Sequence, residues 1–407
     1  MPPMPVRTDR IRPPAEPGGL RDRCILSNGR YGVLLAGDGT GFSWFERWAL
    51  TPWSGGPLES GDGVLVCLRD PEMDGFISLA CPPGGAPPSR GGYRREPGRA
   101  VITRRVGDLE LAVETCVPPE TDASQGLELR RLRLRNHSGR ARTMEITTYG
   151  EVVLNEPLSH VSHPTFSRLF VRSEFVAERR ALLFRRRVRD SGDVFPWMIH
   201  ALLSADAVEH ETDRARFLGR GRDASSPVAL LTRAPLAGTT GDVLDPVFSL
   251  RTRVVVGPGG LVERTFLSGV ADDREAALAL TGLGSADAVA AVEDLFGAAA
   301  RAEERRWRDL GLDAARAFEL ERLAAAVLCG DPKVRPDPAV LRRIRDRELL
   351  PEGSGLKPRK LFTVPTVQAT PSDLRLNEPL LTARFWKALN LPIDVVAVGS
   401  DGECRQL

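Results

Sequence analysis

Alternation of apolar and polar residues is the feature of this sequence that most limits its fold. From Cys24 to about Ala271 the dominant period is two, most clearly at Leu109, Leu111 and Val113. This period puts one face of a strand in a core and the other toward solvent. Clusters of Gly, Pro, Asn and Asp separate many such segments, with no helical pattern between them. The pattern predicts a mainly β fold, a large antiparallel sandwich rather than βαβ units.

The alternating segments define the strands that we expect. They are Val101–Arg105, Leu109–Val117, Leu127–Leu134, Thr143–Leu154, Ser167–Val176, Ala181–Arg187, Ile199–Ser204, Phe248–Val255 and Leu261–Leu267. Within the third segment, the apolar phase slips by one residue at Arg130 and Arg131. Such a slip is typical of a β-bulge, so we expect irregular pairing there.

The apolar period changes to about 3.6 near Asp272, which predicts helices from there to residue 350. Asp272 and Glu275 have the spacing of a capping box, so a short helix is expected at Asp273 to about Thr281. Further helices are expected from Ser285 and Asp337, with breaks at Gly311, Gly330 and Pro332.

These patterns divide the chain into four parts. Residues 1–22, rich in Pro, Gly and Arg, are expected to be a flexible arm, residues 23–271 the sandwich and residues 272–350 a helical linker. Residues 351–407 form the fourth part. The last ~75 residues differ in kind, because all four lysines of the chain follow Gly330, against fifty-two arginines overall. Here the expected elements are Leu361–Val367 as a strand, Leu380–Leu389 as a helix, and Ile393–Val398.

Composition excludes several classes of protein. A net charge of +2 over 407 residues gives no field toward nucleic acid or anionic lipid. The uncharged runs are far shorter than the ~20 residues that a membrane span needs. The N-terminal stretch is polar, without the apolar segment typical of a signal peptide, and the six cysteines include no Cys-x-x-Cys pair. We therefore expect reduced thiols and a cytoplasmic location.

Sequence motifs predict neither a cofactor nor a metal. The glycine loop Gly37–Gly41 resembles a nucleotide-binding loop, but Phe42 stands where a dinucleotide fingerprint needs a third Gly or Ala. His160 and His163 have no Cys or carboxylate ligands at usable spacing beside them. Six carboxylates fall near expected loops or strand ends, but spacing pairs none of them for glycoside hydrolysis: Glu46, Glu151, Glu156, Glu174, Asp213 and Asp245.

Aromatic residues cluster near the N-terminus. Tyr31, Phe42, Trp44, Phe45, Trp48 and Trp53 fall within 23 residues, although aromatics are 6% of the chain. Flat rings of this kind stack on sugar rings, or they fill the core of a sandwich, and the sequence leaves both interpretations open. Trp44, just after the glycine loop, is the ring that we expect to face outward.

Longer blocks of sequence resemble a known family. They are SNGRY at 27–31, GTGFSW at 39–44, TPW at 51–53, TYGEVVL at 148–154, HPTFSRLFV at 163–171, ETDRARFLGRGR at 211–222, GTTG at 238–241 and DPVFSL at 245–250. In this order they resemble the N-terminal sandwich region of glycoside hydrolase family 94, formerly glycosyltransferase family 36. The resemblance covers roughly residues 24–350 and is greatest to the phosphorylase-like part of cyclic β-1,2-glucan synthases.

The resemblance implies a β-supersandwich, then linker helices, then an (α/α)6 barrel that holds the general acid and most of the sugar and phosphate site. Twelve barrel helices of about 11 residues do not fit in the last ~55 residues. No catalytic residue of the family is therefore carried over, and we expect neither phosphorolysis nor glucosyl transfer from this chain alone. Those last residues are expected to pack poorly, with Leu380, Phe385, Trp386 and Val395–Val398 exposed for want of a barrel.

The sequence thus predicts a carbohydrate-binding supersandwich that is not catalytic by itself and binds a β-glucan weakly. Candidate sugar contacts are Trp44, Phe42, Tyr31, Arg168, Arg216 and Arg220. The alternative is an assembly module that docks on a separate barrel-bearing chain or on a second copy. A small glycosidase that uses the sandwich carboxylates ranks last.

Overall fold

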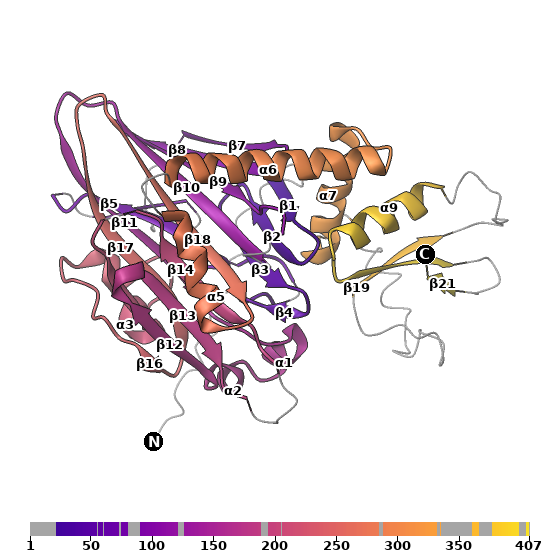
Figure 1. Cartoon of the computed structure of the whole chain (residues 1–407), viewed down its shortest axis with the longest axis horizontal. Helices are drawn as coiled ribbons and strands as arrows, with labels where there is room; N and C mark the ends of the chain where they lie inside the picture. Colours follow the sequence, from indigo (N-terminus) through magenta and orange to yellow (C-terminus); the bar gives the residue numbers. More distant parts are fainter. Residues whose placement is uncertain are drawn as a thin grey trace, which may run out of the picture.

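The computed structural model describes residues 22–54, 56–59, 61–72, 75–79, 90–120, 126–188, 194–204, 206–284, 288–331, 334, 360–365, 377–398 and 404–406. The expected arm up to residue 21 and the helix expected from Asp337 lie outside this range. Within it, antiparallel sheets occupy residues 23–271 and helices follow, so the predicted fold class is confirmed (Figure 1).

Three antiparallel sheets form the sandwich. The nine-stranded sheet has the order β16 (Gly241–Asp242), β12 (Val171–Val176), β13 (Ala181–Arg186), β14 (Trp197–Leu202), β18 (Leu261–Ala271), β10 (Gly126–Asn136), β9 (Leu109–Cys116), β8 (Arg99–Val106) and β7 (Arg90–Glu96). The five-stranded sheet has the order β15 (Glu209–Asp213), β17 (Pro246–Val256), β11 (Arg142–Glu151), β5 (Leu65–Arg69) and β6 (Ile77–Ser78). The four-stranded sheet consists of β1 (Arg23–Ser27), β2 (Tyr31–Ala36), β3 (Gly41–Phe45) and β4 (Trp48–Ala49).

One apolar core joins the three sheets, with Val33, Leu134 and Ile146 among its fully buried members. A second core lies where α5 (Arg274–Ala279) and α6 (Ala288–Asp309) cover the other face of the nine-stranded sheet (Figure 1). A third joins the outer face of the four-stranded sheet to α7 (Ala314–Leu328) and α9 (Asn377–Ala388). Cores therefore lie on both faces of the nine-stranded sheet and of the four-stranded sheet.

The segment after β11 is helical where a strand was predicted to begin at Ser167. Two short helices, α1 (Pro157–Ser162) and α2 (Pro164–Arg168), precede β12. Each begins with proline, whose fixed φ suits the first turn of a helix and which cannot donate to a sheet.

The bulge predicted at Arg130 and Arg131 is wrong. Strand β10 pairs with β9 and with β18 in continuous register through both residues. Its two faces are both buried: Glu128 and Arg130 form an ion pair inside the sandwich (3.3 Å), while Arg131 contacts Glu114 (2.7 Å) on the face that α6 covers. Along one face of β10 charged residues are followed by apolar ones, and along the other face apolar residues are followed by charged ones. This exchange, and not an extra residue, produces the apparent slip.

The linker helices begin and break close to the predicted residues, while the predicted end at residue 350 lies outside the described residues. Asp273, one residue after the predicted cap, accepts a hydrogen bond from the Ala276 N–H at 2.8 Å and starts α5. Gly311 has a φ of +69° between α6 and α7, and Gly330 has a φ of +60° after α7. Both glycines adopt the left-handed conformation that ends helices.

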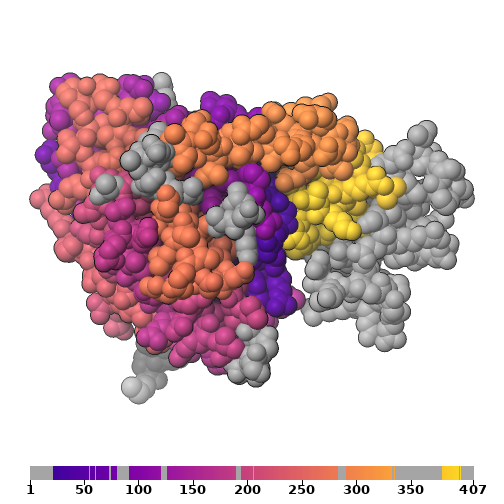
Figure 2. Space-filling model, viewed as in Figure 1, coloured from indigo at the N-terminus to yellow at the C-terminus, as the bar shows by residue number. Residues whose placement is uncertain are grey.

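For the described side chains among the last ~55 residues, the prediction of poor packing is also wrong. Phe385 and Trp386 are 0% and 1% exposed, and the Trp386 indole donates to the Leu320 carbonyl of α7 at 3.0 Å. Strands β19 (Lys360–Pro365), β20 (Ile393–Val398) and β21 (Cys404–Gln406) form a small sheet in which β19 and β20 are parallel. Figure 2 shows this C-terminal part in contact with the linker helices. The apolar side chains therefore find partners on α7 and the four-stranded sheet. The side chains of residues 396–398 lie outside the described part.

A neutral histidine lies inside the sandwich. His200 is fully buried, with Nε2 at 2.9 Å from Thr148 Oγ1 and Nδ1 at 2.9 Å from Ser268 Oγ. Burial, with a smaller contribution from the Arg130 charge, lowers the pKa of His200 to about 3. The folded protein therefore excludes a proton that the unfolded chain takes up near the usual pKa of about 6.5.

Acid is therefore expected to destabilise the fold through His200. The contribution is absent above the unfolded pKa and grows as the pH falls toward the folded pKa of about 3. Between pH 7 and pH 5 the free energy of unfolding should fall by about 2 kcal/mol from this group. Urea titrations at both pH values should show that His200→Gln removes this decrement and that His163→Gln, at an exposed position, retains it. An equal decrement in His200→Gln would contradict the assignment.

Candidate functional site

Five charged residues converge at one end of the sandwich, and we call them the Glu151 cluster. They are Glu151 at the end of β11, Arg168 at the end of α2, Asp213 at the end of β15, Arg214 at the start of α3 (Arg214–Leu218), and Asp245 just before β17. Glu151 accepts from Arg168 at 2.8 Å on Oε2 and from Arg214 at 2.7 Å on Oε1. Arg168 also donates to Asp245 at 3.1 Å.

Backbone contacts fix the strand ends around this cluster. The Asp213 carboxylate accepts from the Ala215 N–H at 2.8 Å and so caps α3. The Arg214 N–H donates to the Asp245 carbonyl at 3.0 Å, which joins the chain after β15 to the chain before β17. Arg216 projects from α3 with a side chain that is 60% exposed, 3.8 Å from Asp213.

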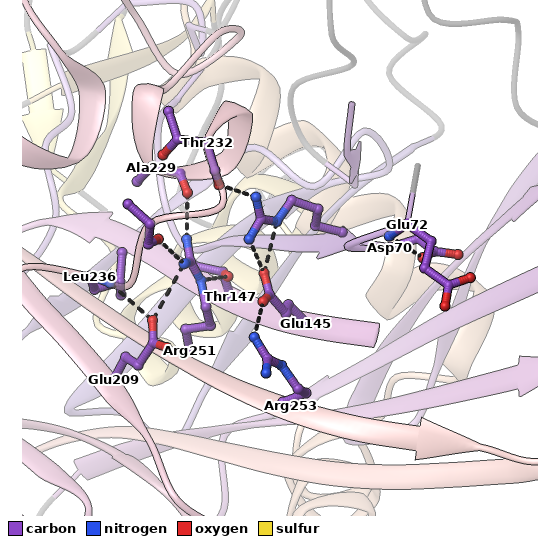
Figure 3. Close-up of polar contacts among 12 residues, drawn as sticks. Asp70, Glu72, Glu145, Thr147, Glu209, Ala229, Thr232, Leu236, Arg251 and Arg253 are labelled. Carbon is purple, nitrogen blue, oxygen red and sulfur yellow. Dashed lines mark hydrogen bonds and ion pairs between the residues drawn. The ribbon is translucent and has the colours of Figure 1, made fainter. Parts of the chain in front are cut away.

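A buried arginine network holds the segment that follows α3 (Figure 3). Arg251 donates to the carbonyls of Ala229 and Ala234, around α4 (Val228–Leu231), and Arg69 donates to the Thr232 carbonyl. Arg69 and Arg253 both contact the Glu145 carboxylate. Burial raises the pKa of Glu145, but the hydrogen bonds from Arg253 and Arg69 outweigh it and leave the pKa below its usual value. The network therefore positions the loop between α3 and β16.

Two further titratable groups lie near the cluster. Burial, together with the charges of Glu59 and Glu151, raises the pKa of Asp62 to about 6, against a hydrogen bond from the Glu59 N–H. Burial and the Arg168 charge lower the pKa of His160 to about 4. The cluster thus holds carboxylates and guanidinium groups with a neutral imidazole beside them. Among the residues that the structure describes, no three His, Cys, Asp or Glu side chains gather closely enough to hold a metal ion.

Asp62 and Arg214 are members of this region that the sequence reasoning missed. Asp62 stands between Gly61 and Gly63, whose φ angles are +104° and +88°. An acidic residue between two glycines, shortly before a strand, indicates a tight turn. This signal is visible in the sequence.

The three aromatic candidates are not at this site. Trp44, Phe42 and Tyr31 are 7%, 4% and 0% exposed, so none presents a face to a sugar and the outward position expected for Trp44 is wrong. Trp44 lies so close to the backbone of Gly32 that an added Cβ there would stand 2.1 Å from its ring. Phe42 stacks on Trp53 with centroids 4.3 Å apart. Phe42 and Trp44 are buried because α7 and α9 cover the outer face of the four-stranded sheet, whereas Tyr31 lies in the core that joins the three sheets.

The arginine candidates fare differently. Arg168 lies within the cluster, Arg216 at its rim, and Arg220 is exposed after α3. The remaining carboxylates form separate ion pairs: Glu46 with Arg30, Glu156 with Arg47, and Glu174 with Arg274.

Comparison with known proteins shows which family the chain belongs to. Residues 20–283 match the family model for the glycosyl hydrolase 94 supersandwich domain. The chain belongs to this family. The cyclic beta-(1,2)-glucan synthase NdvB of Rhizobium meliloti (strain 1021) is 36% identical over 259 residues. The match covers 63% of this chain but only 9% of that synthase.

Solved structures show weaker likeness. A bacterial glucoamylase complexed with acarbose aligns with 78% of this chain and 42% of its own, at 7% identity and a TM-score of 0.46. A mutant of the heparan sulfate lyase HepC from Pedobacter heparinus covers 60% of this chain and 34% of its own, at 11% identity and a TM-score of 0.32. These scores support no statement about what the supersandwich binds.

No helix among the described residues is long and apolar enough to span a bilayer.

Proposed function

We propose that this chain is a carbohydrate-binding supersandwich of a β-glucan-processing protein, with sugar contacts at the Glu151 cluster, Arg216 and Arg220. The proposal rests on the convergence of separate sequence blocks on this cluster. Four blocks that resemble the family, at 148–154, 163–171, 211–222 and 245–250, each supply a residue to the cluster. A β-1,2-glucan is the proposed ligand, because the 36% identical relative is a cyclic beta-(1,2)-glucan synthase. A cytoplasmic location is part of the same proposal.

The chemistry of the exposed groups suits sugar hydroxyls. Arg216 and Arg220 reach solvent, and a guanidinium offers five donors in a rigid fork that matches vicinal hydroxyls. Asp245, with a side chain that is 36% exposed, offers acceptor oxygens beside them. The three candidate rings are buried and contribute no stacking. We therefore expect a dissociation constant of order millimolar.

The contacts of Glu151 favour binding without catalysis. Hydrolysis or phosphorolysis needs a carboxylic acid that gives its proton to the glycosidic oxygen. Both oxygens of Glu151 are occupied by guanidinium donors, and Asp245 is paired with Arg168. Purified protein given β-1,2-gluco-oligosaccharides and phosphate should release no glucose 1-phosphate and redistribute no chain lengths. Turnover that disappears in Asp213→Ala or Asp245→Ala would contradict this part of the proposal.

Loss of the two rim arginines is expected to weaken sugar binding. One hydrogen bond from a charged group contributes about 1.5 kcal/mol, so Arg216→Ala or Arg220→Ala should each raise the dissociation constant about tenfold. Calorimetric titration with β-1,2-gluco-oligosaccharides measures this. Arg233→Ala removes an exposed arginine from outside the cluster and is the matched control. Equal binding by wild type and by the Arg216/Arg220 double variant would refute the location of the site.

A second candidate function is supported by apolar side chains beside the cluster. Leu158, Phe166 and Leu244 are 62%, 51% and 74% exposed, and exposed apolar groups around charged pairs are typical of protein interfaces. The supersandwich would then be an assembly module that docks on a barrel-bearing chain or on a second copy. In that case oligosaccharides should not bind, and Leu244→Asp should abolish association while Leu231→Asp, also at an exposed leucine, should not.

A further inference from the structure

A cavity of about 150 Å³ lies where the sandwich meets the linker helix α6. Its walls are the end of β1 with Ser27 and Asn28, the turn between β7 and β8, the segment after β9, and α6 with Ala302, Glu303 and Arg306. Figure 1 shows α6 on the opposite side of the molecule from α2, which carries Arg168 of the Glu151 cluster. Drug-sized ligands occupy about 300–1,000 Å³, so this cavity suits a molecule no larger than a monosaccharide.

Most polar groups in the cavity wall already have partners. Ser27 Oγ donates to the Leu389 carbonyl at 2.9 Å and accepts from the Gly29 N–H at 3.0 Å. Asn28 accepts from two backbone N–H groups and donates to the Pro118 carbonyl at 3.1 Å. The two oxygens of Glu303 accept from Arg95 and from the Gly98 N–H.

Arg306 is different. Within the described part of the chain, its guanidinium makes no hydrogen bond and no ion pair within 4.0 Å, although it lines the cavity and is only partly exposed. Burial lowers the pKa of Arg306, against the charges of Glu303 and Glu321, yet an arginine stays protonated in proteins. Arg306 therefore lines a small cavity with five unpaired donors, while the Ser27, Asn28 and Glu303 side chains in the same wall are occupied.

The charge of the surroundings favours an anion. Arg95 and Arg306 lie near two carboxylates, Glu303 and Glu321. Burial raises the pKa of Glu321 to about 7, against the charge of Arg95 and its hydrogen bond. Arg95 contacts both carboxylates, which leaves the Arg306 charge without a partner of its own.

We propose that this cavity binds a small oxyanion, a carboxylate or phosphate group on a molecule no larger than a monosaccharide, with Arg306 as its donor. Guanidinium groups bind both anions through paired N–H···O bonds. A ligand here would contact β1 and α6 together, so its binding would hold the linker helix against the sandwich. This site is independent of the Glu151 cluster and of the proposed function.

Thermal unfolding and calorimetry of the whole chain test the proposal with three probes: inorganic phosphate, glucuronate and glucose. Glucuronate and glucose share a ring and differ in the carboxylate. We expect phosphate, glucuronate or both to bind and raise the melting temperature, with glucose at least tenfold weaker. A ligand that binds the folded state alone stabilises it in this way.

Three variants locate the binding. Arg306→Gln should weaken anion binding at least tenfold, and Ala302→Leu should do the same by filling the cavity with the charge intact. Arg305→Gln, an exposed arginine on the same helix, should bind as wild type does. Circular dichroism checks that each variant is folded. If Arg306→Gln is not folded, Arg306→Lys takes its place, because lysine keeps the charge but lacks the forked donors of a guanidinium. Absence of anion binding in the wild type, or equal binding in Arg306→Gln and wild type, overturns the proposal.

Discussion

Arg95→Ala is expected to lower the free energy of unfolding by about 3–5 kcal/mol, because it leaves two buried carboxylates without their ion-pair partner. Arg95 lies on the edge strand β7, Glu303 on α6 and Glu321 on α7. The side chains are 8%, 7% and 1% exposed, and Arg95 donates to Glu321 at 3.0 and 3.1 Å while it also contacts Glu303. This triad joins both linker helices to the sandwich, so its loss should also expose α6 and α7 to proteolysis.

The neighbouring residue provides the control. Arg94 is on the same strand, is 66% exposed and pairs with Glu96. Surface ion pairs contribute about 0–1 kcal/mol, so Arg94→Ala should change stability little. Chemical denaturation followed by circular dichroism measures both variants. Replacing Glu303 and Glu321 by Gln in the Arg95→Ala background should recover part of the loss. A cost below 1 kcal/mol for Arg95→Ala would show that the helices are held by apolar contacts alone.

Trp44→Ala is expected to destabilise the fold by about 3–5 kcal/mol, the usual range for truncating a buried Trp. The ring lies between the four-stranded sheet and the α7–α9 layer, in a core with Ile25, Leu34 and Phe385. Gly32, which leaves space for the ring, has no side chain to fill the cavity that truncation creates. Phe166→Ala, an aromatic truncation at a half-exposed position, should cost less than 1 kcal/mol.

The same variant separates the two interpretations of the aromatic cluster. A Trp44→Ala protein that keeps its wild-type stability but loses oligosaccharide binding would mean that the ring faces a ligand. A large loss of stability, with residual sugar binding in the folded fraction, is the result that the burial of Trp44 leads us to expect.

Much of the fold follows from sequence periodicity, and the failures have a common cause. Strand β9 follows from the alternation of Leu109, Leu111 and Val113 with less buried residues in its first half. Strand β10 was misread as bulged, because charged side chains are buried on both of its faces. Trp44 was expected outside, because the sequence shows which residues share a face but not that α9, more than 300 residues later, covers it.

The candidate site shows the same limit. Arg168 and Arg216 could be selected from the sequence as exposed donors in blocks that resemble the family. Their partners could not, since Glu151 and Arg214 are 63 residues apart and Arg168 and Asp245 are 77 residues apart. Only the order of strands β15, β17 and β11 in one sheet brings these residues together.

Hydrogen–deuterium exchange with and without saturating β-1,2-gluco-oligosaccharide tests the proposed sugar site most directly. Bound sugar should slow exchange in peptides that cover residues 151–168 and 213–222, which carry Arg216, Arg220 and every member of the Glu151 cluster except Asp245. Peptides that cover residues 37–44 should exchange unchanged, because the Phe42 and Trp44 side chains are already buried. Protection confined to residues 37–44, or none at saturation, would contradict the account.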